Sequence, residues 1–485
     1  MSYGPPPSVY TESALEVGRR GKRRRRLVLG ALAAAVALAC LVVWTGSYGG
    51  EPGSDGRPAV VKQAPDAIRR TVETPPESPE GKAAFRYREE IRQVGATAAA
   101  PGAWATGKIF AKGFVNYIKG FSLSKPARLN DERGDRAAWQ LRFPGPLCAT
   151  TRHVSAAGWT AVAFAGKPVD PKQVLGTPCD RLAVVDIDTG RKLWQTALPS
   201  GDSPPTNVNV TMTDGTVAVA WDQGSAAYDM THGKRLWVHT LADCMDTGFA
   251  GGGKLLALVE CGDSAQPEFR IERVDPRTGR TQWRYRVARG IKEVYLASSS
   301  PAVIAVAAGD YTVTDLLSLD EQGRARATIR LDDDHQVVDC DKPFSAVVES
   351  CPSIVVGRRQ VFISTNDDIV AFDLGTGKSG MRFPSPTGAT MIPLKMSGDQ
   401  LIAYRGGGGV APCAVVSLDP AKGKERFLLL FSWSDDDLSG LDKTDDEFFY
   451  EQGRLYYAAT SVYGPRNKGE VGGLSNIAEG IESVA

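Results

Sequence analysis

The chain has 485 residues, of which 42% are hydrophobic, so it is long enough and apolar enough to bury a large core. Its formal net charge is only +1, and residues 1–26 hold seven basic against two acidic side chains, a net +5, which leaves about −4 for the rest. A folded region with this balance has no general electrostatic attraction for nucleic acid, so we expect no nucleic-acid partner.

The first predicted element is a transmembrane helix over residues 27–46. Leu27–Trp44 is an apolar run of eighteen residues, which at about 1.5 Å per residue nearly crosses a roughly 30 Å hydrocarbon layer. Because the basic, disordered tail of residues 1–26 precedes it, the N-terminus is predicted to be cytoplasmic. A cleaved signal peptide is the alternative, since Ala-Leu-Ala before Cys40 resembles a lipoprotein cleavage site. The sequence therefore predicts a single-pass protein of the cell membrane whose remaining chain is extracytoplasmic.

Residues 47–99 are predicted to form an extracytoplasmic linker. Up to about residue 82 this stretch is rich in Pro, Gly, Glu and Ser and has too few apolar residues to order itself. A short helix is possible at Lys82–Val94, just before the folded part.

From residue 100 to residue 485 the pattern predicts one all-β domain. Short runs of β-branched and aromatic residues, such as Thr216–Asp222 and Leu255–Cys261, are separated by Gly, Asp, Asn and Pro. No long stretch has the 3.6-residue period of an amphipathic helix.

An internal repeat decides which all-β fold is expected. In five copies an aspartate is followed four positions later by glycine and eight positions later by a bulky apolar residue. These are Asp186, Gly190 and Trp194; Asp229, Gly233 and Trp237; Asp275, Gly279 and Trp283; Asp373, Gly377 and Met381; and Asp419, Gly423 and Phe427. A sixth copy at Asp320 lacks one turn residue and the bulky terminus.

The spacing of the six aspartates predicts a β-propeller. They lie 43, 46, 45, 53 and 46 residues apart, and a period near 45 holds the four short strands of one blade. The aspartate can accept hydrogen bonds from the turn backbone, and the glycine supplies the positive φ that closes the turn. The bulky residue then lies at a constant place on the returning outer strand, where it can pack against the neighbouring blade.

The two best-preserved copies, VVDIDTGRKLW and RVDPRTGRTQW, resemble the pyrroloquinoline-quinone-type (PQQ-like) β-propeller repeat. This resemblance implies that the tryptophans dock adjacent blades. The family includes quinone-dependent alcohol and sugar dehydrogenases as well as non-catalytic members, such as the lipoprotein scaffold of outer-membrane protein assembly. The resemblance therefore predicts the fold of this chain more strongly than it predicts an activity.

The repeats predict seven blades, with eight as the alternative. Gly113–Leu123 and the strand around Trp139 are read as two outer strands near the N-terminal end of the domain. Asp446–Gln452 and Arg454–Thr460 are read as two inner strands near the C-terminus. Two strands from each end would complete one blade and close the ring.

The seven cysteines beyond residue 46 indicate disulfides in an oxidising compartment. Within the repeat frame they fall into local pairs, each inside one blade. The expected pairs are Cys148 with Cys179, Cys244 with Cys261, and Cys340 with Cys351. Cys413 is left over, and a free buried thiol is expected there.

No catalytic constellation is found in the sequence, so we expect neither catalysis nor a bound cofactor. A quinoprotein enzyme would carry pyrroloquinoline quinone with calcium, and many such enzymes have an adjacent Cys-Cys pair, which this chain lacks. The weak calcium candidate is an acidic stretch whose oxygen ligands roughly follow EF-hand spacing. Its residues are Asp435, Asp437, Ser439 and Asp446. A solvated acidic loop is the alternative reading. The four histidines show no ligand spacing.

These observations favour a membrane-anchored propeller that binds a protein or cell-envelope partner or a ligand through its surface loops. The alternatives are a quinone-dependent dehydrogenase and an extracytoplasmic sensor that signals to residues 1–26.

Overall fold

The computed structural model divides into two compact units, Met1–Lys62 and Gln63–Ala485. It describes residues 63–91, 97–124, 136–168, 178–199, 204–240, 242–262, 266–309, 312–331, 340, 348–349, 351–365, 368–386, 389–407, 411–432, 446–464 and 474–484. The predicted tail and transmembrane helix at residues 27–46 lie outside these ranges. Within them, no helix has the length and apolarity needed to cross a membrane.

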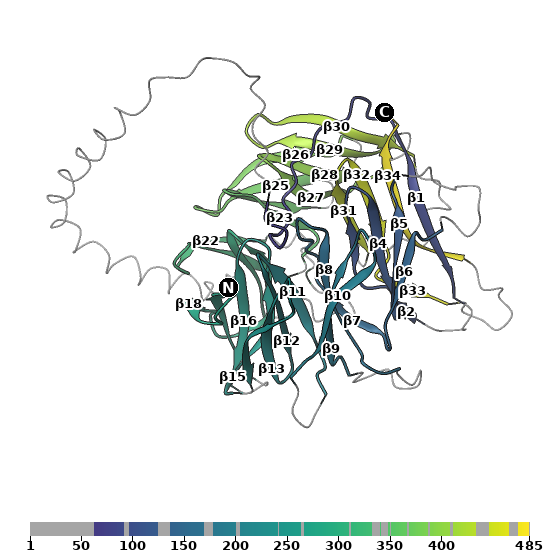
Figure 1. Ribbon diagram of the computed structural model, residues 1–485. Coiled ribbons are helices and arrows are strands. Elements are labelled where there is room, and N and C mark those ends of the chain that lie inside the picture. Colours follow the sequence, from purple (N-terminus) through teal and green to yellow (C-terminus); the bar gives the residue numbers. More distant parts are fainter. Residues whose placement is uncertain are drawn as a thin grey trace, which may run out of the picture. The chain divides into compact units, whose positions relative to one another are not determined.

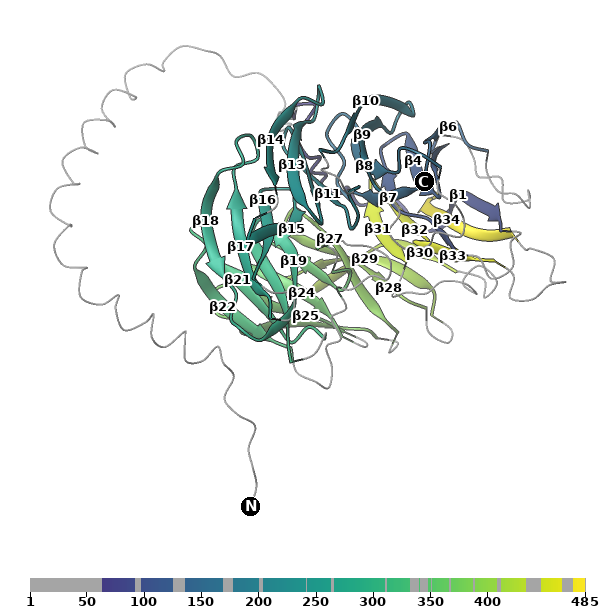
Figure 2. The ribbon, with the colours of Figure 1, turned by 90° about the horizontal axis from the view of Figure 1, so that it is seen from below.

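The second unit is an all-β propeller of eight four-stranded blades, shown in Figures 1 and 2. The first four blades are successive antiparallel meanders. Blade 1 contains β3 (Ala103–Ala105), β4 (Ile109–Phe114), β5 (Tyr117–Ser122) and β6 (Trp139–Arg142); blade 2 contains β7 (Leu147–Thr150), β8 (Trp159–Phe164), β9 (Arg181–Asp186) and β10 (Arg191–Ala197). Blade 3 contains β11 (Asn209–Thr213), β12 (Thr216–Trp221), β13 (Gly224–Asp229) and β14 (Arg235–Thr240); blade 4 contains β15 (Cys244–Ala250), β16 (Leu255–Cys261), β17 (Glu268–Val274) and β18 (Thr281–Arg286).

The next three blades repeat this meander, and the eighth joins the two ends of the unit. Blade 5 contains β19 (Ile291–Ser299), β20 (Ala302–Ala308), β21 (Asp315–Leu319) and β22 (Ala325–Arg330); blade 6 contains β23 (Ile354–Val356), β24 (Gln360–Ser364), β25 (Asp368–Asp373) and β26 (Ser379–Pro384). Blade 7 contains β27 (Met391–Ser397), β28 (Gln400–Arg405), β29 (Cys413–Asp419) and β30 (Lys424–Phe431); blade 8 contains β31 (Glu447–Glu451), β32 (Arg454–Ala458), β34 (Leu474–Ser483) and β1 (Gly81–Glu90). A separate pair joins β2 (Thr97–Ala99) to β33 (Ser461–Tyr463).

The residue pattern of each strand follows its position in the blade. The second strand of blade 3, β12, is buried at all six positions because both of its faces pack against neighbouring blades. Such strands read as continuous apolar runs. The outermost strand of the same blade, β14, is exposed at four of its six positions, and Trp237 is its one buried side chain. The core therefore consists of layers between adjacent blades.

The prediction of seven blades is wrong, and the alternative of eight is confirmed. The stretch read as one outer strand, Gly113–Leu123, spans the turn between β4 and β5, so residues 103–142 form a complete blade of their own. The closing blade takes one strand from the N-terminal end and three from the C-terminal end. Antiparallel pairing of β1 with β34 closes the ring, with Gly81 opposite Ser483.

The short helix considered at Lys82–Val94 is also wrong for the residues described there. Residues 81–90 form β1, and the folded unit begins before the boundary at residue 100. Tertiary contacts determine that this segment forms a strand. Phe85 and Tyr87 pack in a buried aromatic cluster with Phe110, Phe121 and Tyr456. Tertiary packing thus overrides a local sequence that is compatible with a helix.

Candidate functional site

The repeat aspartates and glycines form tight turns on one side of the ring, which we call the turn face. In the first of these turns, Asp186 Oδ1 accepts the backbone N–H groups of Asp188 at 2.9 Å and Thr189 at 3.2 Å. The corresponding contacts are made by Asp229, Asp275, Asp320, Asp373 and Asp419. All six turn glycines have positive φ: Gly190, Gly233, Gly279, Gly323, Gly377 and Gly423.

In five blades a bulky residue lies against the turn glycine of the next blade, whereas the bulky residue Phe427 of blade 7 is exposed. A Cβ atom added to Gly233 would lie 2.6 Å from Cδ2 of Trp194, and one added to Gly279 would lie 2.9 Å from Cγ of Trp237. Trp194 Nε1 also donates to the carbonyl oxygen of Met230 at 2.7 Å. The same relationship joins Trp139 to Gly190, Trp283 to Gly323, and Met381 to Gly423. The repeat residues therefore hold successive blades together.

A segment near the start of the second unit crosses the inner ends of the blades at the turn face. We call Pro65–Glu73 the rim segment; it belongs to the dark purple start of the unit in Figure 1. Ile68 N donates to Asp214 Oδ1 of blade 3 at 2.8 Å, and Arg69 N donates to the carbonyl oxygen of Val154 in blade 2 at 2.9 Å. The Arg69 guanidinium lies 3.5 Å from the Glu451 carboxylate of blade 8.

The C-terminal end of the rim segment is held by a buried glutamate. The side chain of Glu73 is only 3% exposed and lies 2.9 Å from Lys395 Nζ of blade 7. Its carboxylate also accepts the backbone N–H groups of Gln452 and Gly453 in blade 8. Lys395 in turn contacts Glu451 at 2.7 Å. This end of the rim segment is thus bonded to blade 7 and to blade 8, the blade in which the ring closes.

A second buried carboxylate, Glu349, reaches the inner strands from the connection between blades 5 and 6. Thr211 Oγ1 of β11 lies 3.1 and 3.0 Å from its two oxygens, and the backbone N–H of Gly251 donates to Oε2 at 2.7 Å. His153 Nε2 lies 3.3 Å from Oε1, an ion-pair distance without hydrogen-bond alignment. Arg152 donates to the main-chain oxygen of Glu349 at 3.1 Å. Residues from blades 2, 3 and 4 therefore converge on one side chain.

The electrostatic surroundings keep Glu349 ionised. Burial opposes its ionisation, but the charges of His153 and Arg152 and the N–H of Gly251 outweigh this effect. The pKa of Glu349 is consequently held below its usual range. Next to it, Val348 accepts a backbone hydrogen bond from Leu296 of β19 at 2.7 Å. Four successive blades, 2 to 5, thus contact Val348 and Glu349.

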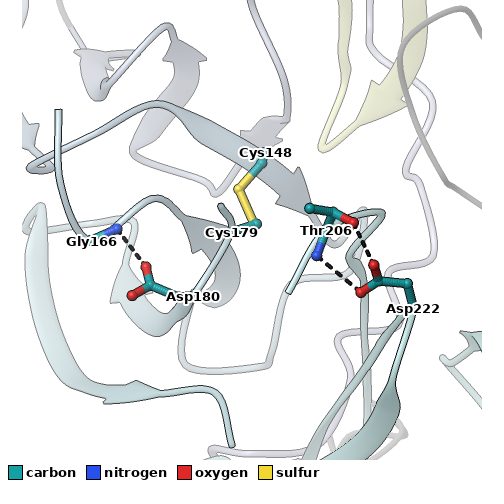
Figure 3. Close-up of a disulfide and its surroundings, with 6 residues drawn as sticks. All are labelled: Cys148, Gly166, Cys179, Asp180, Thr206 and Asp222. Atoms are coloured by element: carbon teal, nitrogen blue, oxygen red, sulfur yellow. Dashed lines mark hydrogen bonds between the residues drawn. A yellow bond between two sulfur atoms is a disulfide. The ribbon is translucent and has the colours of Figure 1, made fainter. Parts of the chain in front are cut away.

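The three disulfides join the expected pairs: Cys148 with Cys179, Cys244 with Cys261, and Cys340 with Cys351. The first two lie at the side opposite the turn face, which we call the connection face because blades are linked to one another there. Figure 3 shows the Cys148–Cys179 bond with Asp180 Oδ1 accepting the N–H of Gly166 at 2.7 Å. The third disulfide closes the loop that holds Glu349. Cys413 is a free, buried thiol.

The calcium candidate is only partly within the described residues. Asp435, Asp437 and Ser439 lie outside them. Asp446 is buried, and its carboxylate accepts hydrogen bonds from Tyr457 Oη at 2.5 Å and from the backbone N–H of Thr460 at 3.3 Å. In the part of the chain that the structure describes, no group of three or more His, Cys, Asp or Glu side chains could hold a metal ion.

Two chain segments outside the blades lie at the inner ends of the strands. Val348 and Glu349 contact four blades, 2 to 5. The rim segment contacts blades 2, 3, 7 and 8 at the turn face.

The sequence pointed to neither Glu349 nor its partners. His153 is one of the four histidines without ligand spacing, Thr211 lies in the middle of a short strand, and Gly251 directly follows another strand. One signal was present: the interval between Asp320 and Asp373 is 53 residues, against 43 to 46 elsewhere, and it contains Cys340 and Cys351. A longer blade connection closed by a disulfide marks an insertion with a role of its own.

The sequence model of the family described as "Outer membrane protein assembly factor BamB" matches residues 128–258 and 180–395, which together span more than half of the chain. The chain belongs to this family of PQQ-like β-propellers. The predicted resemblance is therefore confirmed, and the PQQ-like repeat is the building unit of this ring.

Two solved structures are similar to this PQQ-like propeller. BamB from Moraxella catarrhalis is 13% identical, with a TM-score of 0.41, and the match covers 82% of this chain and 100% of that one. The β-propeller domain of Cps50 (Swd1) from Myceliophteria thermophila is 14% identical, with a TM-score of 0.38, and the match covers 72% of this chain and 100% of that one. No curated protein is a significant match.

Proposed function

We propose that this PQQ-like propeller is a membrane-anchored extracytoplasmic module that binds a protein partner and performs no catalysis. The observation that carries the proposal is the position of Glu349, which fills the inner ends of blades 2, 3 and 4. The PQQ-like resemblance implies that a quinone-dependent enzyme would hold its cofactor in this central part of the ring. Membership of a family described as an assembly factor supports a protein as the partner. The apolar run at Leu27–Trp44 and three disulfides support an anchored, extracytoplasmic location.

The connection face is the better surface for the partner. The rim segment crosses the inner ends of the blades at the turn face, and the repeat turns there are short. Two long connections lie at the other face, one from the end of β8 at Phe164 to Arg181 and one from the end of β30 at Phe431 to Glu447. The turn face has one connection of similar length, from Ser122 to Trp139. Surface connections on a rigid ring are the usual location of binding residues.

Site-specific photo-crosslinking in the native membrane tests this function. A photoreactive residue replaces Lys167 at the connection face or the matched exposed residue His232 at the turn face. We expect one discrete crosslinked product from position 167 and none from position 232. If neither position, nor other exposed positions on both faces, gives a discrete product, the binding function is contradicted.

Catalysis is tested separately with the purified full-length protein. Calcium and pyrroloquinoline quinone are added, and bound absorbance and dye reduction with alcohols and aldoses are followed. We expect neither signal. Dye reduction that depends on the added quinone would replace the binding proposal with an enzymatic one.

A further inference from the structure

The contacts around Glu349 have the composition of an anion-binding site. Its contacts come from three blades: the hydroxyl group of Thr211 and the main-chain N–H of Gly251 donate hydrogen bonds, and the ring nitrogen of His153 lies 3.3 Å away at an ion-pair distance. Thr211 is fully buried, and the side chain of Glu349 is only 6% exposed. Hydrogen bonds to an ionised carboxylate in a low-dielectric place are strong.

The donors belong to a rigid frame, whereas the carboxylate arrives on a connection. Thr211 lies in the innermost strand β11, paired with Ala218 of β12. Gly251 follows β15 directly, and a Cβ added there would lie 2.1 Å from the carbonyl oxygen of Met212, so its backbone is tightly packed. Glu349 instead belongs to the loop between β22 and β23, which the Cys340–Cys351 disulfide closes. The groups that contact the carboxylate therefore belong to the blades, whereas the carboxylate itself belongs to a connection between two other blades.

We propose that blades 2, 3 and 4 form a carboxylate-binding site at the inner rim, and that Glu349 is its tethered intramolecular ligand. The site recognises a carboxylate through Thr211, Gly251 and His153, while Arg152 fixes the main chain of the occupant. Removing the Glu349 side chain leaves the donors in place for a free carboxylate of the same size. This inference does not depend on the proposed function, because its test measures carboxylate binding at the inner rim and not partner binding or catalysis.

The tether predicts that a free carboxylate competes poorly with the native chain. A ligand on a short loop has a high effective concentration at its site, and the disulfide shortens the loop between residues 340 and 351. Free carboxylates are therefore expected to act on a variant that lacks the side chain and to leave the wild type unchanged.

The test is chemical rescue of the full-length Glu349→Ala protein with sodium acetate. The substitution removes a buried charge that satisfies several donors, so the melting temperature falls by several degrees. Increasing acetate raises the melting temperature of the variant in a saturable way, because a ligand that binds only the folded state stabilises it. Acetamide, which has the same shape without charge, and sodium chloride at equal ionic strength produce no such rise.

A second variant tests whether acetate acts at the site that Thr211 helps to form. In the Thr211→Val, Glu349→Ala double variant the acetate-dependent rise is lost, because the hydroxyl donor is absent. The proposal is overturned if acetate, acetamide and chloride act alike, if the wild type shifts equally, or if the double variant is still rescued.

If Glu349→Ala does not fold, a double-mutant cycle with the isosteric Glu349→Gln protein decides the question. Thr211→Val lowers the melting temperature of the wild type more than that of Glu349→Gln, because the hydroxyl then serves an amide and not a carboxylate. Equal decreases of the melting temperature in the two backgrounds contradict a site that distinguishes a carboxylate from an amide.

Discussion

The indole of Trp194 lies over Gly233 in the turn of the following blade and donates a hydrogen bond to the carbonyl oxygen of Met230 at 2.7 Å. Position 233 requires glycine for two reasons. The turn has a positive φ there, and the indole of Trp194 leaves no room for a Cβ atom. Blades 1 to 4 and blade 6 each place a bulky side chain on the turn glycine of the next blade.

Gly233→Ala should destabilise the propeller more than the same change at Gly398. Both glycines have positive φ, so each substitution costs about 1 kcal/mol of backbone strain. At Gly398 an added Cβ meets nothing within 4 Å, whereas at Gly233 it displaces Trp194 and adds about 1–3 kcal/mol. The free energies of unfolding in urea measure the difference. Equal losses at the two positions would show that the indole contact is unimportant.

Trp194→Ala should lower the free energy of unfolding by about 3 kcal/mol, the lower end for a buried tryptophan because the side chain is only partly buried. Its aromatic ring packs against the core cluster between blades 2 and 3. An unchanged melting temperature would rule out this docking role.

Trp194→Phe and Trp283→Phe form a matched pair that isolates the indole hydrogen bond. The N–H of Trp194 is bonded to Met230, while the buried N–H of Trp283 has no partner among the described residues. Trp194→Phe should therefore lose about 1 kcal/mol more than Trp283→Phe. Thermal unfolding of both variants provides the measurement, and a larger loss for Trp283→Phe would refute the assignment.

Glu89→Gln should weaken the closure between blades 8 and 1. One carboxylate oxygen, Oε1, accepts Tyr87 Oη at 2.6 Å and Tyr117 Oη at 2.8 Å, and it also pairs with Lys119. Burial opposes ionisation of this group, but these three donors hold the pKa of Glu89 below its usual range.

A lowered carboxylate pKa contributes stability above the unfolded pKa of about 4.3, and this stability is lost as the pH falls through the folded pKa. The wild type should therefore lose more stability on acidification than Glu89→Gln does. Urea unfolding between pH 7 and pH 3 measures this, with the exposed Glu77→Gln variant as control. Parallel pH profiles for wild type and Glu89→Gln would contradict the role.

His239→Gln should remove a pH-dependent contribution of opposite sign. A hydrogen bond to Asp246 at 3.1 Å is the main cause that raises the pKa of His239, against the smaller effect of burial. The contribution is present below the unfolded pKa of about 6.5 and is lost as the pH rises through the folded pKa. Because His239 is 46% exposed, solvent screening limits the effect to below about 1 kcal/mol.

Unfolding of His239→Gln is compared with that of wild type between pH 5 and pH 8. The wild type should lose its small advantage over the variant as the pH rises. A His232→Gln variant controls for the loss of an imidazole at a more exposed place. An advantage that grows with pH would have the wrong sign for this ion pair.

Replacing both Cys148 and Cys179 by alanine should lower stability by about 3 kcal/mol. The bond closes a loop of 31 residues in sequence, and its loss frees the unfolded chain. Cys413→Ala serves as the control for removing a buried sulfur without a crosslink. A loss no larger than that of the control would show that the crosslink adds nothing.

The local chemistry of the repeat made the fold predictable. Asp186, Gly190 and Trp194 act through one turn and one neighbour, so their spacing is visible in the sequence. Ring closure was harder to predict, because β1 is defined by pairing with β34 almost four hundred residues away. Glu349 was missed for a related reason: its partners lie 98 to 197 residues distant and share no motif.

The rim segment also determines how the ring responds to mechanical load applied from its N-terminal side. A pull transmitted through residue 63 meets the bond from Ile68 to Asp214 and the Glu73–Lys395 ion pair before it reaches the ten-residue strand that closes the circle. Because Glu73 also accepts the N–H groups of Gln452 and Gly453 in blade 8, we expect the tension to be shared among blades 3, 7 and 8 and β1 to be protected from separating from β34.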